Sequence, residues 1–213
     1  MDDADDSDGE ADGWTGMGGA LSVNEGFFAA FKLASEEMWS NKSIRENVWG
    51  FQLQPGTRWN RGLSDGEIRE YEAVVDISFP SVFCTYLREM NGTDKPAIDI
   101  RGNSGENHRF GPGFYSYPRD MEAIHKMIRH AWADASQLRE TLLDEGFCLP
   151  DDAKLVPIYS HRFVVCSSRL DAGVVLSIWD SSDAIVYGRS LQEYLEREIL
   201  LSRSPYSSSP ACS

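Results

Sequence analysis

The sequence predicts an α+β fold in a single domain, with a mostly antiparallel sheet of about four to six strands flanked by helices. Three observations lead to this prediction. Helical patterns dominate the first two thirds of the 213-residue chain, four closely spaced β-branched or aromatic runs follow, and another helical pattern comes after them. Connections between the four runs are too short for parallel crossovers, so they indicate an antiparallel meander.

The first expected elements are a helix over residues 25–39, where apolar residues recur at helical spacing, and an extended segment over 49–56. Ser64 and Glu67 then form the two ends of a capping box, which begins a second helix. On its apolar positions, this helix is expected to bury Ile68, Tyr71, Val74 and Val75.

Pro80 suits the first turn of a third helix, on which Phe83, Leu87 and Met90 are the apolar positions. We expect this helix to end at Asn91-Gly92, where the glycine can adopt a left-handed conformation.

The middle of the chain predicts a strand over 97–101, a glycine-rich loop over 102–113 and a short strand over 114–117. Pro118 then precedes a helical pattern whose apolar face holds Met121, Ile124, Ile128 and either Ala131 or Trp132.

The last third contains the four predicted strands, separated by short turns. They are expected over residues 155–159, 162–166, 174–179 and 184–187. Ser190 and Glu193 are placed as a further capping box, which predicts a helix that buries Leu191, Tyr194, Leu195 and Ile199.

The net charge of −14 argues against binding to nucleic acids or to anionic membranes, since both need clustered Lys and Arg. Seven acids and no base stand in residues 1–13, so residues 1–22 are expected to be a disordered acidic leader. The folded domain is expected over 23–201, and residues 202–213 are expected to be a flexible Ser/Pro tail. Within the domain, acids concentrate in two stripes, over 65–76 and 140–152.

The four cysteines include no Cys-x-x-Cys pair, and the chain has neither an apolar run of 18 residues nor a basic, apolar start. These features predict a reduced, cytoplasmic protein without a membrane span.

A search for catalytic motifs finds no phosphate loop, no HExxH and no GxSxG. His125 and His130 are five residues apart, which is unsuitable spacing for two ligands on one helix face. His161 and Cys166 would lie on opposite faces of a strand, so a hairpin histidine and a core thiol are favoured over a catalytic dyad. We therefore expect no catalytic residue, metal or cofactor, and no enzymatic activity.

Several segments together resemble the SUKH superfamily, over about residues 49–200. The resemblance rests on the order and spacing of two groups of motifs. The first group is Gly62-Leu63-Ser64-Asp65-Gly66-Glu67-Ile68, Phe79-Pro80, Tyr86-Leu87 and Met90-Asn91-Gly92. The second is Leu155-Val156-Pro157-Ile158-Tyr159-Ser160-His161-Arg162-Phe163, Val175-Leu176-Ser177-Ile178, Ile185-Val186-Tyr187-Gly188 and Leu191-x-x-Tyr194-Leu195. Ser160 stands where a glycine is frequent in the family, and Tyr115-Ser116-Tyr117-Pro118-Arg119-Asp120 looks like a feature of one subgroup.

The resemblance implies a non-catalytic protein-binding module, in many bacterial members an immunity protein that neutralises a nuclease or deaminase toxin. The alternative is an intracellular regulatory or adaptor scaffold with no toxin partner. An acidic surface would complement the basic cleft of a toxin, with aromatic anchors at the centre. The candidate partner-binding residues are Trp49, Asp65, Glu67, Glu70, Glu72, Tyr159, His161 and Trp179. Tryptophan and tyrosine are also frequent in cores, so a structural role stays open for each aromatic candidate.

Overall fold

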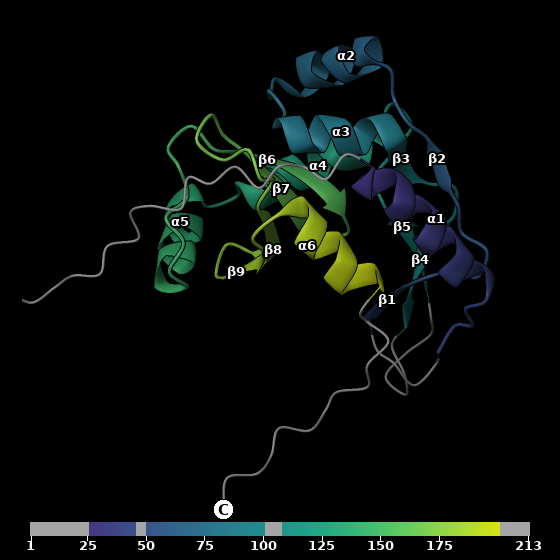
Figure 1. Cartoon of the computed structure of the whole chain (residues 1–213). Helices are drawn as coiled ribbons and strands as arrows, with labels where there is room; N and C mark the ends of the chain where they lie inside the picture. The colour runs from purple at the N-terminus through teal and green to yellow at the C-terminus, as the bar shows by residue number, and fades with distance from the viewer. Residues whose placement is uncertain (1–25, 46–49, 101–107, 201–213) are drawn as a thin grey trace, which may run out of the picture.

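The computed structural model describes residues 26–45, 50–100 and 108–200 of the chain (Figure 1). Within them it contains six α-helices, a π-helical segment and nine strands, which pair antiparallel in three sheets. The α+β prediction is therefore confirmed.

Three of the sequence predictions lie outside the described residues: the leader over 1–22, the tail over 202–213 and the anchor Trp49. Among the described helices, none combines the length and the apolar character that crossing a lipid bilayer requires.

The largest sheet has four strands in the order β6-β7-β8-β9, which confirms the predicted meander. Its strands are β6 (Lys154–Tyr159), β7 (Arg162–Cys166), β8 (Val175–Asp180) and β9 (Asp183–Gly188). We call it the central sheet, because both of its faces are covered.

Successive side chains of the central sheet enter two different apolar clusters. Leu155, Phe163 and Leu176 belong to a cluster with helix α5, whereas Val156, Val164 and Val175 belong to a larger cluster with α1, α3 and α6. Because both faces are buried, the sequence of each of these strands is a continuous apolar run and does not alternate between apolar and polar residues.

The helices are arranged around this sheet (Figure 1). Helix α5 packs beside β9, α6 also contacts β9, and α4 crosses β6 and β8. Helix α4 supplies Ile124 to the larger cluster and Ala131 to the other. The helices are α1 (Phe27–Ser40), α2 (Asp65–Val75), α3 (Ser81–Glu89), α4 (Met121–Ala131), α5 (Ala135–Asp144) and α6 (Leu191–Leu195), which continues into the π-helix η2 (Glu196–Leu200).

Helix α2 begins with the predicted capping box: the Ser64 hydroxyl accepts from the Glu67 amide, and the Glu67 carboxylate accepts from the Ser64 amide. Ile68 and Tyr71 are buried as expected and Val75 is partly buried, but Val74 is half exposed, so that part of the prediction is wrong. The reason is position: α2 lies outside α3, at the edge of the molecule, and packs along one narrow face (Figure 1).

At Ser190 the hydroxyl also accepts from the Glu193 amide, as predicted, but the Glu193 carboxylate bonds to the amide of Arg189 rather than to that of Ser190. The helix that follows buries Leu191, Tyr194, Leu195 and Ile199.

Two smaller sheets carry the remaining strands, and here some sequence predictions fail. Their strands are β1 (Gly50–Leu53), β4 (Pro96–Ile100) and β5 (His108–Pro112), in the order β1-β4-β5, and the pair β2 (Trp59–Arg61) and β3 (Met90–Thr93). Strand β5 lies inside the segment predicted to be a loop. Its Gly and Pro residues suggest a loop in the sequence, but both are tolerated here because β5 is an edge strand.

The predicted strand over 114–117 is absent from the structure. Phe114 instead makes an isolated bridge to Tyr159 at the edge of β6.

The predicted end of the third helix at Asn91-Gly92 is also wrong, because α3 ends at Glu89 and β3 follows directly. Gly92 does have the expected left-handed conformation, with a φ of +69°. Its role, however, is to let the main chain near Tyr115 pack closely against β3. A Cβ at this position would lie 2.6 Å from the carbonyl oxygen of Tyr115.

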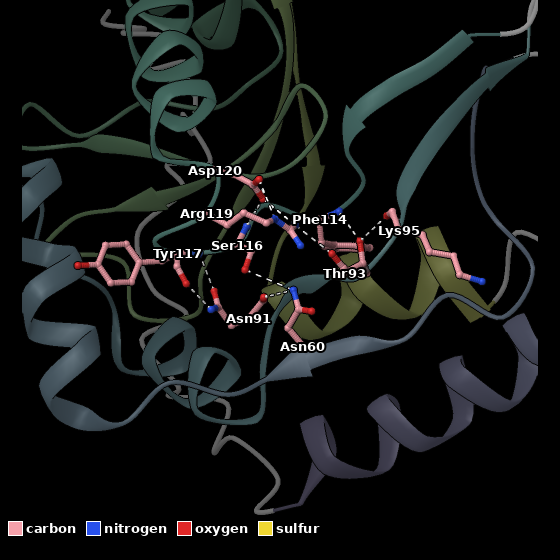
Figure 2. Close-up of polar contacts among 9 residues, drawn as sticks. All are labelled: Asn60, Asn91, Thr93, Lys95, Phe114, Ser116, Tyr117, Arg119 and Asp120. Carbon is pink, nitrogen blue, oxygen red and sulfur yellow. Dashed lines mark hydrogen bonds and ion pairs between the residues drawn. The ribbon is translucent and has the colours of Figure 1, made fainter.

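A polar network holds β3 against the segment that precedes α4 (Figure 2). The buried side chain of Asn91 donates to the Tyr117 carbonyl at 2.6 Å and accepts from the Tyr117 amide at 2.9 Å. Arg119 donates to the Thr93 carbonyl at 3.0 Å and pairs with Asp120. Asn91, from one of the motifs that support the family resemblance, and Arg119 thus join two parts of the fold.

Replacing Asn91 with Ala should destabilise the protein by about 1–3 kcal/mol, since both main-chain polar groups of Tyr117 would lose their partners in a partly buried setting. Equilibrium unfolding in urea measures this change. Asn41→Ala is the matched control: its side chain is exposed, donates once to the Glu37 carbonyl, and should cost less than about 0.5 kcal/mol. Equal effects of the two substitutions would contradict the role assigned to the network.

Candidate functional site

The described candidate residues fall into two places. Asp65, Glu67, Glu70 and Glu72 lie on α2, and the three aromatic candidates lie around one end of the central sheet.

Two acids of α2 are already paired with arginines. Asp65 accepts from the Arg88 side chain at 2.8 Å, and Arg61 forms an ion pair with Glu67. Hydrogen bonding to Arg61, followed by that to Ser64, lowers the pKa of Glu67 to about 2. Both carboxylates are therefore engaged in holding the start of α2.

Glu72 has a structural role too, because its carboxylate accepts from the Phe79 amide at 2.7 Å and so braces the turn between α2 and α3. Within the described residues, Glu70 is exposed and makes no such contact. The acidic face of α2 consequently presents much less unpaired charge than its sequence indicates.

Tyr159, one of the aromatic candidates, is a core residue. Only 4% of its surface is exposed, and its ring packs against Phe114 with ring centres 4.8 Å apart. A partner cannot reach this ring in the folded protein.

His161 occupies the hairpin between β6 and β7, as expected. The residue before it, Ser160, has a φ of +48°, a left-handed conformation that suits the glycine expected there. The imidazole lies edge-on to the Trp179 ring, with ring centres 5.4 Å apart, and also contacts Phe51. Burial, with the nearby charges of Arg162 and His130, lowers the pKa of His161 to about 4, so this ring is neutral near pH 7.

Trp179 lies in a β-bulge. Ile178 pairs with Ala184 and Asp180 with Asp183, which leaves Trp179 as the extra residue of β8. Its side chain is 59% exposed, and its carbonyl oxygen accepts from Nε2 of His130 at 2.8 Å. The bulge therefore directs a large aromatic ring towards solvent, and α4 holds the bulge in place.

These elements enclose a hollow of about 450 Å³ with a mainly apolar wall, which we call the Trp179 hollow. It is lined by Lys126, Met127, His130, Ser160, His161, Trp179 and Asp180. The structure thus brings together two of the predicted residues, His161 and Trp179, and separates them from the acids of α2.

Sequence reasoning missed His130 and Met127 as parts of this site. Both are on α4, and only the packing of α4 across β8 brings them to Trp179. The five-residue spacing between His125 and His130 in the sequence does not predict the contact of His130 with Trp179.

Asp180 lines the hollow, Asp183 pairs with it across the β8–β9 turn, and Asp134 contacts that turn; we call these three residues the turn acids. Asp180 accepts from the amides of Ser182 and Asp183, and hydrogen bonding to Ser182 lowers the pKa of Asp180. The Asp134 amide lies 3.3 Å from the Ser181 hydroxyl, which ties the start of α5 to the β8–β9 turn.

A second hollow, of about 670 Å³, lies between the α2–α3 turn and the ends of β6 and β7. Its best-placed carboxylates are already bonded: Asp152 accepts from Ser167 and Ser168, and Asp171 accepts from Ser81. Burial raises the pKa of the Cys166 thiol in its wall, so this cysteine is a poor nucleophile. Across the described ranges, no group of three or more potential ligands is arranged to hold a metal ion.

Comparisons of the chain with protein-family models, with curated proteins and with solved structures found no match. Membership of the SUKH superfamily therefore stays a prediction, and the site is interpreted from its own geometry.

The lowered pKa of His161 predicts a pH-dependent stability. Between pH 6.5 and about pH 4, the unfolded state takes up a proton that the folded state resists, so stability is present above 6.5 and falls as pH decreases. From about pH 7 to pH 4.5, the native chain should lose roughly 1–2 kcal/mol more than a His161→Phe variant, which keeps a ring but cannot titrate. Urea unfolding at both pH values measures the difference, and identical pH dependence of the two chains would contradict the burial of a neutral imidazole.

Proposed function

We propose that this chain is a cytoplasmic protein-binding module of the immunity type, which neutralises a basic toxin domain by docking on it and carries out no reaction itself. The observation that carries the proposal is the exposed ring of Trp179, presented by a β-bulge at the rim of an apolar hollow. Tryptophan is among the side chains most often found at the energetic centre of protein interfaces.

The surroundings of Trp179 support binding because they are rigid. His161 packs edge-on against the ring, and His130 bonds to the main chain of the same residue. An anchor that is already held in place loses little conformational entropy on binding, which favours affinity. In this arrangement the two histidines support the anchor, and neither is given a proton-transfer role.

The net charge of −14 supports a basic partner. An acidic protein attracts a basic nuclease or deaminase over distances of about one Debye length, roughly 8–10 Å at moderate salt, and raises the rate of encounter. Covering the basic cleft that grips nucleic acid would then block the toxin without any chemistry.

Trp179→Ala should weaken binding to the cognate toxin domain by about 30-fold or more, which corresponds to an interface hot spot of about 2 kcal/mol. Calorimetric titration measures the affinity, and growth of cells that co-express toxin and variant measures protection. Leu33→Ala is the matched control, since Leu33 is 71% exposed on α1, away from the hollow. Undiminished protection by Trp179→Ala would count against the proposed function, as would equal losses in both variants.

A further inference from the structure

We propose that the Trp179 hollow receives one apolar side chain of the partner that is flanked in sequence by Lys or Arg, with the flanking cation placed against the turn acids. This inference rests on the proposed function and names the chemistry of the segment that the same site recognises.

The apolar part of the proposal follows from the wall of the hollow. Met127 and the rings of His161 and Trp179 supply apolar surface from three different elements, α4, the β6–β7 hairpin and β8. A side chain that enters the hollow would bury its own surface together with part of the indole, and removing this apolar area from water favours binding. A neutral His161 adds to this surface without the desolvation cost of a charged group.

The charged part follows from the turn acids. Asp134, Asp180 and Asp183 are all exposed, and in the described part of the chain none of them forms an ion pair. Hydrogen bonds from main-chain amides fix Asp180, and the contact between Asp134 and Ser181 holds the two segments together. Asp180 therefore brings a carboxylate without an ion pair into the wall of the hollow, and Asp134 and Asp183 add two more at the β8–β9 turn.

The acids of α2 provide the contrast that locates the cation. Asp65 and Glu67 already have arginine partners, so a partner cation would have to compete with Arg88 and Arg61. The turn acids require no such exchange, and Asp180 among them lines the hollow itself.

Two lining residues of opposite charge fix the direction of the bound segment. They are Asp180 on β8 and Lys126 on α4. A cation is attracted to Asp180 and repelled by Lys126. The flanking Lys or Arg is therefore placed towards the β8–β9 turn.

The test uses three short probes, acetyl-Lys-Phe-Lys-amide, acetyl-Glu-Phe-Glu-amide and acetyl-Lys-Ser-Lys-amide, titrated into the full ¹⁵N-labelled chain. The indole N–H signal of Trp179 is identified by its loss in Trp179→Phe. We expect the Lys-Phe-Lys peptide to shift this signal saturably, with a dissociation constant on the order of millimolar. The other two peptides should bind at least about tenfold more weakly, since each lacks one of the two features.

The double variant Asp180→Asn with Asp183→Asn keeps acceptor oxygens but removes two charges, so it should weaken Lys-Phe-Lys binding by about three- to tenfold. Glu70→Gln with Asp76→Asn, on α2 and directly after its last residue, is the matched control and should leave the binding unchanged. Shifts centred on α2, equal binding of the Glu-Phe-Glu peptide, or no saturable shift of the Trp179 indole would each overturn the inference.

These outcomes are separable from those that bear on the proposed function. Peptide binding as expected, together with no protection against any toxin, would count against the immunity role and support the site. Protection that depends on Trp179, together with no peptide binding, would overturn only the recognition of a cation-flanked apolar side chain.

Discussion

The central sheet is buried on both faces, and the positions of the helices and of the candidate site follow from that burial. Alternate side chains of β6, β7 and β8 enter two separate apolar clusters, so helices must cover each face. Once both faces are used, a large side chain of this sheet can reach solvent only at its edges and ends. The bulge at Trp179 and the hairpin at Ser160-His161 lie at such an end, which is where the only exposed tryptophan among the described residues is found.

The fold also decides which acids are paired with cations. On α2, Arg88 and Arg61 pair with Asp65 and Glu67, and these bonds fix the start of the helix. The carboxylates of Glu72 on α2 and of Asp180 beside Trp179 are held by main-chain amides, which leave the charge of both uncompensated. A count of acids along the sequence therefore overstates the unpaired charge of α2, and of these four acids only Asp180 lines the Trp179 hollow.

Much of the fold could be predicted from the sequence because the signals are local. The capping box at Ser64 and the four apolar runs of the central sheet specify elements that the structure confirms. The failures have non-local causes: β3 forms because β2 is available to pair with it, and Gly92 is required by a loop that approaches from residue 115. At the site, His161 and Trp179 could be selected by residue type, but the burial of Tyr159 and the contact of His130 with Trp179 arise only from packing.

We propose that a partner contacts the Trp179 end of the central sheet, since helices cover both faces of that sheet. Hydroxyl-radical footprinting of the full chain, with and without a bound toxin domain, would detect this contact. Bound toxin should protect Trp179 and Met127 from oxidation and leave the reactivity of the exposed Leu33 on α1 unchanged. Unchanged oxidation of Trp179 in the complex, with protection of Leu33 or of Val74 on α2, would contradict this proposal.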